Sequence, residues 1–402
     1  MNQPLAGVRV LDLSRVLAGP WCTQLLADLG AEVIKVEQPG QGDDTRHWGP
    51  PWLEHDGTKV AAYFLAANRG KRSVAIDFAT PEGAALVRRM AADADVVVEN
   101  FKVGGLAKFG LDAATLRADH ARLIYLSITG FGQDGPYAAR AGYDYIIQGM
   151  GGLMSLTGLP DGEPGGGPMR VGVAVADLFT GMYSANAILA ALYRREATGE
   201  GATIDMALFD TQLAMLANQA SNALISGKDP GRQGAGHPNI VPYQPFAAAD
   251  QPVIIAVGND RQFAKLAAIL GHNEWATDAD FATNAARVAA RDRLVPQIAA
   301  IIAGKTAAEW RDQLEAAGIP AGPINSISQA LADPQAIHRG VRINAGGGAL
   351  GEVPMVGSPI RIDGERADAA LPPPALGEHG DLLREWIDGD ELERLKAAGI
   401  VG

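Results

Sequence analysis

The chain has 402 residues, of which 47% are hydrophobic and 20% charged, and its net charge is −12. The length predicts about two or three domains with sizeable cores, and the composition argues against wholesale disorder. The negative charge argues against general nucleic-acid binding, which normally needs a basic surface. An anionic ligand would therefore have to be bound by local cationic groups.

Cysteine usage and targeting signals point to an ordinary intracellular protein. Cys22 is the single cysteine and reads as buried filler, and no Cys/His cluster has the spacing of metal ligands, so we expect no metal site. The first residues lack a charged leader followed by an apolar core, and no continuous apolar run reaches the roughly 18 residues of a membrane span. We therefore expect a cytoplasmic protein that does not associate with membranes.

Residues 7–127 alternate short β-branched runs with helical patterns, which predicts an open α/β domain around a mostly parallel sheet. Pro20 and Gly30 bracket the first helix. The turn before this helix follows the first strand at its carboxyl end, where such sheets bind ligands, but it lacks the Gly-x-Gly-x-x-Gly spacing of a dinucleotide site. The expected strands are 8–13, 32–36, 73–77, 96–99, 123–127 and, further along, 202–208.

Three further stretches could face a ligand. Residues 38–58 combine Pro, Gly and Asp with two tryptophans, and we interpret them as a loop folded over a pocket, with simple packing onto the domain as the alternative. Cations gather at 69–72 and at Lys102 and Lys108. Each of these clusters is either a solvated face or a phosphate site.

One acidic side chain stands at the start of a long helical pattern. The glycine-rich segment 149–172 leads towards Asp177, after which apolar residues recur at steps of three and four to about Arg195. We predict that Asp177 is the N-cap of this helix, a position that favours the ionised carboxylate and lowers its pKa. Such an aspartate suits nucleophilic attack, and a purely structural cap is the alternative.

The composition changes near Ser226, where glycine and proline cluster. The next unit has a strand pattern at 253–257 and helical patterns at 262–270, 287–303 and 307–317, and a last helix is expected near 382–396. We therefore predict a large domain at 1–225, a smaller α+β domain at 226–323 and a C-terminal segment at 324–402.

A set of segments, in order along nearly the whole chain, carries a family resemblance. They are residues 11–20, 26–37, Gly42-Asp-Asp-Thr-Arg46, 98–101, Gly142-Tyr-Asp144, the helix at Asp177, 237–243, 258–263 and Leu376-Gly-Glu-His379. Together they resemble the class III (CaiB/BaiF-type) coenzyme A transferase family. No single segment is decisive, but the ordered set is highly specific.

The resemblance implies a Rossmann-like large domain completed by the C-terminal segment, a small domain, and a homodimer of two interlocked rings. It implies acyl-CoA and carboxylic acids as substrates, with no tightly bound cofactor. It places Asp177 at the catalytic position, where acyl-anhydride and aspartyl-CoA thioester intermediates form. It implies coenzyme contacts at Leu17, Ala18, Ile76, Asn100, Phe101, Lys102, Lys108, Tyr143 and Asp144, and substrate or lid roles for Arg46, Trp48, Arg140, Gly234 and Gly236.

Departures from the family pattern affect the phosphate contacts and leave the substrate open. Some relatives carry arginine at the position of Gln38 and lysine at that of Ala79, so Arg46 or Lys71 would have to substitute. The forms of 237–243 and 258–263 look most like transferases that use succinyl-CoA or a related dicarboxylate. Arg46 and Arg140 are then the candidate partners of a distal carboxylate.

Two rival functions share this fold. An α-methylacyl-CoA racemase needs an acid/base pair and resembles Gly-His-Asp where this chain has Gly142-Tyr-Asp144. Tyrosine, with a free pKa of about 10, replaces such a histidine poorly. A non-catalytic acyl-CoA-binding protein is the second rival, and the presence of Asp177 argues against it.

Overall fold

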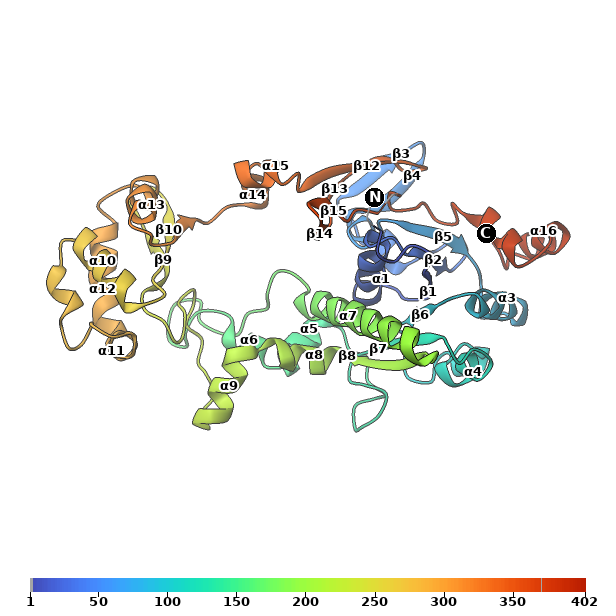
Figure 1. Ribbon diagram of the computed structural model, residues 1–402, viewed down its shortest axis with the longest axis horizontal. Helices are drawn as coiled ribbons and strands as arrows, with labels where there is room; N and C mark the ends of the chain where they lie inside the picture. Colours follow the sequence, from blue (N-terminus) through green and yellow to red (C-terminus); the bar gives the residue numbers. More distant parts are fainter. Residues whose placement is uncertain (1–2, 370) are drawn as a thin grey trace. The chain divides into compact units, whose positions relative to one another are not determined.

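The computed structural model describes residues 3–369 and 371–402 (Figure 1). Within this part the chain forms two compact units. The large unit contains residues 3–153, 171–224 and, apart from residue 370, 334–402; the small unit contains residues 154–170 and 225–333. The chain therefore leaves the large unit twice, and its last segment returns to it.

A six-stranded parallel sheet forms the centre of the large unit, in the order β5–β2–β1–β6–β7–β8. Counted within the sheet, this is the order 3-2-1-4-5-6 of a Rossmann fold, so the strand order reverses between β1 and β6. The predicted α/β class and parallel sheet are confirmed. The strands are β1 (Arg9–Asp12), β2 (Glu32–Glu37), β5 (Lys71–Ala75), β6 (Val96–Glu99), β7 (Ile124–Thr129) and β8 (Ala202–Ala207).

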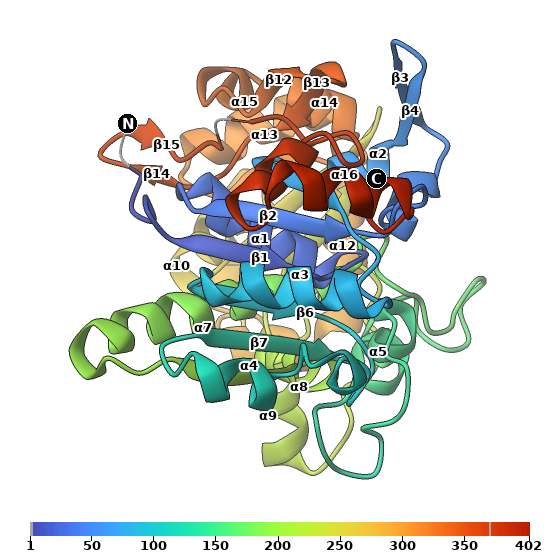
Figure 2. The ribbon, with the colours of Figure 1, turned by 90° about the vertical axis from the view of Figure 1, so that its right-hand side faces the viewer.

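Helices cover both faces of this sheet. Neighbouring residues of a strand point to opposite faces, so Val10 packs with α1 and α7 while Leu11 packs with α3, α4 and α16. Figure 2 shows the second group of helices in front of the strands. These helices are α1 (Ala18–Asp28), α3 (Pro81–Ala92), α4 (Ala113–Asp119), α7 (Val175–Thr198) and α16 (Gly389–Ala397).

Two segments of the large unit differ from the sequence prediction. The expected loop at 38–58 contains a 3-10 turn, η1 (Asp44–His47), and an antiparallel hairpin, β3 (Trp52–His55) and β4 (Thr58–Ala61). The hairpin turns at Asp56-Gly57, both with positive φ, a pair that favours such turns. After β8 the sequence pattern of residues 209–223 would also suit a single helix, but the chain forms two, α8 (Leu208–Met215) and α9 (Ala217–Ser226), because Ala217 adopts a φ of 46°.

Shorter elements complete the large unit. They are α2 (Ala62–Leu65), η2 (Ala107–Phe109), α5 (Asp144–Met150), α15 (Pro334–His338), β12 (Arg342–Gly348), β13 (Gly351–Val356), β14 (Arg361–Ile362), β15 (Glu365–Arg366) and η4 (Gly380–Glu385), while α6 (Leu153–Leu156) lies where the chain first leaves it.

The small unit is an α+β structure with its own core. Its antiparallel sheet has the order β11–β10–β9, and Phe263, Ile298 and Trp310 are buried against it. The helical pattern expected at 287–303 is two helices, α11 and α12. The elements are β9 (Tyr243–Ala247), β10 (Pro252–Ala256), β11 (Ala321–Pro323), α10 (Asp260–Ile269), η3 (Asn273–Ala276), α11 (Asn284–Ala289), α12 (Arg291–Ile302), α13 (Ala307–Ala316) and α14 (Ile327–Leu331).

Among the described residues, α7 is the one helix that is long and apolar enough to cross a membrane. The sequence analysis did not single it out, because polar residues interrupt its apolar stretch. Its inner face, with Ile188 and Leu192, packs in the core beside the sheet. Of its most apolar stretch, 44% is buried. A core helix passes the same test of length and hydropathy, so the test alone does not indicate a membrane span.

Candidate active site

A cavity of about 450 Å³ lies at the carboxyl ends of β1, β6 and β7. This is the edge at which the strand order reverses, and open α/β sheets bind their ligands there. Most of the side chains that the sequence predicts for the coenzyme or substrate line this one cavity. They are Leu17, Ala18, Asn100, Phe101, Lys102, Lys108, Arg140 and Tyr143, together with Asp177.

Asp177 lies in the first turn of α7 rather than at its cap. The helix begins at Val175, and its N-cap residue Ala174 makes no side-chain bond. The acceptor comes from α5 instead, because Asp144 Oδ1 accepts a hydrogen bond from the Ala176 N–H at 2.9 Å. The prediction that Asp177 is the N-cap is therefore wrong. Within the described residues, no hydrogen-bond donor contacts its carboxylate.

The predicted direction of the Asp177 pKa is also wrong. Burial, and after it the negative charge of Asp144, raises the pKa of Asp177 from 3.8 to about 7. Desolvation and a neighbouring carboxylate both disfavour the ionised form, and here they exceed the stabilisation from the helix N-terminus. Near neutral pH the side chain is consequently divided between acid and carboxylate.

Tyr63 faces the same carboxylates. Burial, followed by the charges of Asp177, Asp144 and Asp43, raises the pKa of Tyr63. The phenol therefore stays protonated near Asp177 and is able to donate a hydrogen bond. The ring of Trp48 meets that of Tyr63 edge-on, with 5.2 Å between the ring centres. Trp48 thus contacts a neighbour of the cavity, although it does not line the cavity itself.

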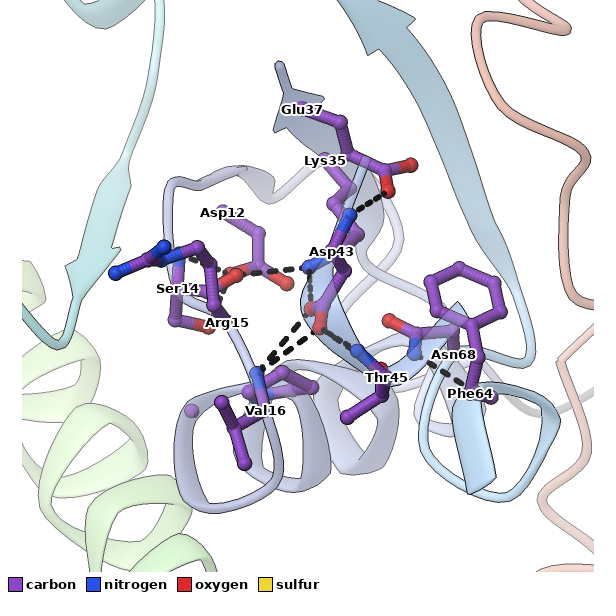
Figure 3. A network of polar contacts seen from close by, with 12 residues as sticks. Asp12, Ser14, Arg15, Val16, Lys35, Glu37, Asp43, Thr45, Phe64 and Asn68 are labelled. Atoms are coloured by element: carbon purple, nitrogen blue, oxygen red, sulfur yellow. Dashed lines mark hydrogen bonds and ion pairs between the residues drawn. The ribbon is translucent and has the colours of Figure 1, made fainter. Parts of the chain in front are cut away.

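Residues 14–17 lead from β1 to α1, and Arg15, Val16 and Leu17 line the cavity. Figure 3 shows the polar contacts around this part of the chain. We refer to it as the 14–17 loop. Val16 adopts a φ of 71°, a left-handed conformation that is a genuine outlier for a β-branched residue. Its N–H donates to both carboxylate oxygens of Asp43, each at 3.2 Å. Asp43 in turn forms an ion pair with Lys35 at 3.0 Å, and both side chains are fully buried.

The four cationic side chains that the sequence predicts for ligand binding have different neighbours. Lys102 and Lys108 line the cavity, and Lys108 Nζ lies 4.7 Å from the centre of the Phe109 ring. The guanidinium of Arg140 lies 3.8 Å from the centre of the Tyr137 ring. Arg46 is buried and forms two hydrogen bonds to Glu37, at 2.7 and 2.8 Å.

Comparison with known proteins identifies the family. Residues 5–380 match the model of CoA-transferase family III. The chain belongs to CoA-transferase family III. The resemblance drawn from the ordered segments is thereby confirmed, and the protein is a CoA-transferase.

Relatives and a solved structure agree with this family. A succinate–glutarate CoA-transferase from Agrobacterium fabrum is 54% identical over 94% of this chain and 94% of its own length. A succinyl-CoA:glutarate CoA-transferase from Mus musculus is 43% identical over 99% of this chain and 90% of its own. The crystal structure of a CaiB/BaiF family protein from Brucella suis matches with a TM-score of 0.84 at 52% identity, covering 98% of this chain and all of that one.

Several side chains predicted for ligands have other partners in this CoA-transferase. Arg46 pairs with Glu37 and stacks over Phe64, and Lys71 is fully buried against Asp12 at 3.0 Å, so neither is free to bind a phosphate or a substrate carboxylate. Ile76 is fully buried in the core and pairs with Val401. Its side chain therefore has no exposed surface, and its proximity to the adenine remains a prediction.

Two glycines predicted as a lid lie in the small unit. The Gly234 N–H donates to the Gly158 carbonyl at 3.1 Å, and the Gly236 N–H donates to the Gln233 carbonyl at 2.9 Å. Gly234 has a φ of 58°, a conformation that glycine adopts readily. Their role as a lid remains a prediction.

The sequence analysis missed Tyr63, Lys35 and Asp43. One signal for Lys35 was present, because it stands between Ile34 and Val36 in a strand whose two faces are both covered. A lysine in such a strand must find a buried partner. For Asp43, the signal was the Thr two residues later, whose N–H and hydroxyl both donate to it. Nothing in the local sequence singled out Tyr63.

Proposed function

We propose that this CoA-transferase moves coenzyme A from succinyl-CoA to glutarate or a closely similar dicarboxylate, with Asp177 as the nucleophile. The observation that carries the proposal is the position of Asp177, which lines a cavity together with Lys102 and Lys108 and whose carboxylate accepts no hydrogen bond from the described residues. The names of the Agrobacterium fabrum and Mus musculus relatives support the choice of donor and acceptor.

The cycle needs four acyl transfers at one carboxylate. An Asp177 oxygen attacks the succinyl thioester, the C–S bond breaks, and CoA thiolate leaves a mixed anhydride on the enzyme. The thiolate then attacks the Asp177 carbonyl, which releases succinate and leaves aspartyl-CoA. Glutarate attacks this thioester and expels the thiolate, which attacks the glutaryl carbonyl and frees Asp177. The thioester's free energy is kept because the carrier is covalent and water is excluded.

The cations and glycines receive roles within this proposal. Lys102 and Lys108 would neutralise the coenzyme phosphates in a chain whose net charge is otherwise negative. Arg140, the candidate left for a distal carboxylate after Arg46 is excluded, lines the same cavity. Gly234 and Gly236 would form a mobile cover that shields the anhydride. Tyr63 would donate a hydrogen bond near the reacting carboxylate.

The assembly is part of the proposal. We infer that two chains form an interlocked homodimer in the cytoplasm, with a large domain at 1–225, a small domain at 226–323 and a C-terminal segment that belongs to the large domain. Support comes from the outer face of α5, α7 and α8, which are in contact with one another and expose large apolar side chains. Soluble monomers rarely expose so large an apolar face.

The experiment that tests the proposal replaces the nucleophile. Asp177→Ala and Asp177→Asn should lower the rate of CoA transfer from succinyl-CoA to glutarate by on the order of a thousandfold or more. Because the raised pKa means that the ionised side chain is disfavoured in the folded protein, Asp177→Asn should be at least as stable as the parent at pH 8. Incubation of the parent with succinyl-CoA and then hydroxylamine should trap Asp177 as a hydroxamate.

Two results would contradict it. Transfer at the parent's rate by a folded Asp177→Asn protein would exclude Asp177 as the nucleophile. A preference of the parent for branched or aromatic monocarboxylates over glutarate would leave the nucleophile intact but overturn the proposed acceptor.

A further inference from the structure

We infer that the buried pair Asp43 and Lys35, together with Asn100, is a positioning device that holds the 14–17 loop in its left-handed turn and so shapes the wall that receives the acyl-CoA. The inference rests on the proposed function, because it concerns the same cavity. It assigns to Asp43 and Lys35, whose side chains are fully buried, an indirect role in binding that acts through the main chain of the loop.

The loop would not keep its conformation by itself. Val16 has a φ of 71°, in which the Cβ of a branched residue is crowded by its own backbone. Such a residue persists only where its surroundings determine the conformation. Val16, Leu17 and Ala18 all line the cavity that contains Asp177, so a relaxed loop would change the shape of that cavity.

Each peptide group at the start of the loop is bound by a side chain from elsewhere (Figure 3). The Ser14 N–H donates to Asp12 at 2.9 Å, and the Ser14 carbonyl accepts from Lys35 Nζ at 2.7 Å. The Val16 N–H donates to Asp43. Lys35 thus connects the contacts of Ser14 and Val16, because it also forms the ion pair with Asp43.

Asn100 secures the remaining peptide group. Its Oδ1 accepts from the Arg15 N–H at 2.8 Å, and its Nδ2 donates to the Arg15 carbonyl at 2.6 Å. Both the oxygen and the nitrogen of its amide therefore bind the loop, while its predicted contact with the coenzyme in the cavity that it lines remains a prediction. Asn100 comes directly after β6, so it ties the loop to the neighbouring strand.

Asp43 is itself fixed from three sides. It accepts from the Thr45 N–H at 3.0 Å and from the Thr45 hydroxyl at 2.8 Å, and its own N–H donates to Glu37 at 2.9 Å. Its side chain is fully buried and does not line the cavity with Asp177. Asp43 reaches the wall of that cavity through the Val16 N–H and, by way of Lys35, through the Ser14 carbonyl.

A double-mutant cycle tests this inference. Asp43→Asn should weaken binding of coenzyme A, titrated into the protein in a calorimeter, by about tenfold, the loss expected for one charge-assisted hydrogen bond. Val16→Gly removes the crowding, since glycine adopts a positive φ readily. In the Val16→Gly background, Asp43→Asn should therefore cost threefold or less, a partial rescue that a merely structural role of Asp43 would not produce.

Matched variants separate binding from stability. Asp28→Asn removes a comparably buried ion pair, to Arg69 at 2.6 Å, away from the cavity, and should lower stability without weakening CoA binding. If Asp43→Asn does not fold, Thr45→Val removes one bond to Asp43 and should change binding in the same direction by a smaller factor, again reduced by Val16→Gly.

The outcomes are distinct. An unchanged affinity of Asp43→Asn for CoA, or an equal loss in both backgrounds, would overturn the positioning role. If the parent binds CoA and the cycle shows rescue while succinyl transfer to glutarate is absent, the proposed function fails and the positioning role stands. Failure of the parent to bind CoA would overturn both.

Discussion

At the residue scale, the ionisation of Asp177 reflects competing influences. A helix N-terminus favours a carboxylate by about 0.3–1 kcal/mol, which corresponds to less than one pKa unit. Burial and the charge of Asp144 act in the other direction and raise the pKa to about 7. Asp144, which caps the helix, therefore also disfavours the negative charge on Asp177, the proposed nucleophile.

This arrangement predicts an acid limb in the pH profile. Attack on the thioester needs the carboxylate, so kcat/KM should fall as the pH drops below about 7, and the fall should be tenfold per pH unit at lower pH. Asp144→Asn removes the neighbouring negative charge, which should move the limb to lower pH. Burial is the larger cause, so the limb should stay above pH 4.

Glu99 is the control for this assignment. Burial also raises the pKa of Glu99 to about 7, and its carboxylate is bound to the Phe101 N–H beside the cavity. Glu99→Gln should leave the limb in place. If the acid limb disappeared in Glu99→Gln and stayed in place in Asp144→Asn, the titrating group would be Glu99, and the prediction would be contradicted.

At the scale of the elements, the site depends on how closely α1 approaches α7. A Cβ added at Gly181 would lie 2.7 Å from the Ala18 carbonyl oxygen and 3.1 Å from Trp21. Real Cβ atoms do not occupy such a position, so only glycine fits at this crossing. Asp177 stands one turn before Gly181, and Ala18 lines the cavity, so the crossing also sets the distance between the nucleophile and the 14–17 loop.

Gly181→Ala is therefore expected to destabilise the protein. Added bulk in a packed contact costs about 1–3 kcal/mol, and this exceeds the gain of about 1 kcal/mol in helix propensity when the clash cannot be relieved. Urea unfolding should show the loss, and kcat/KM should fall as well. Gly172→Ala is the matched control, because its Cβ would meet nothing within 4 Å. Equal stability of the two variants would show that α1 moves away without cost.

The elements also show how far the sequence could be read. Runs of apolar β-branched residues such as Val96–Val98 are decisive for buried parallel strands, and all six sheet strands were predicted. The N-cap of α7 could not be predicted, because its acceptor, Asp144, belongs to another helix. The cavity wall was found mainly by resemblance, whereas the buried partners of Lys35, Lys71 and Arg46 depend on contacts between strands and loops that local patterns do not specify.

At the scale of the whole molecule, the outer face of α7 has no cover within the described chain. Tyr193 is 84% exposed, Met182 48% and Tyr183 46%. Burying such side chains contributes about 1.5–3 kcal/mol each. In the proposed homodimer, a second copy of the chain would cover this face. A two-fold interface would then contain the outer face of α7 from both copies.

The proposed interlocked dimer makes a prediction that an ordinary dimer does not. Light scattering should give twice the chain mass of 41.9 kDa, and this mass should persist on dilution to nanomolar concentration, because linked rings separate only when one chain unfolds. Tyr193→Glu would place a charge in the covered face and should reduce the yield of dimer on refolding, whereas Glu196→Gln, on the same helix, should not. A mass that falls to one chain on dilution would exclude interlocking while leaving a weaker two-fold contact, and a single-chain mass at every concentration would exclude the homodimer.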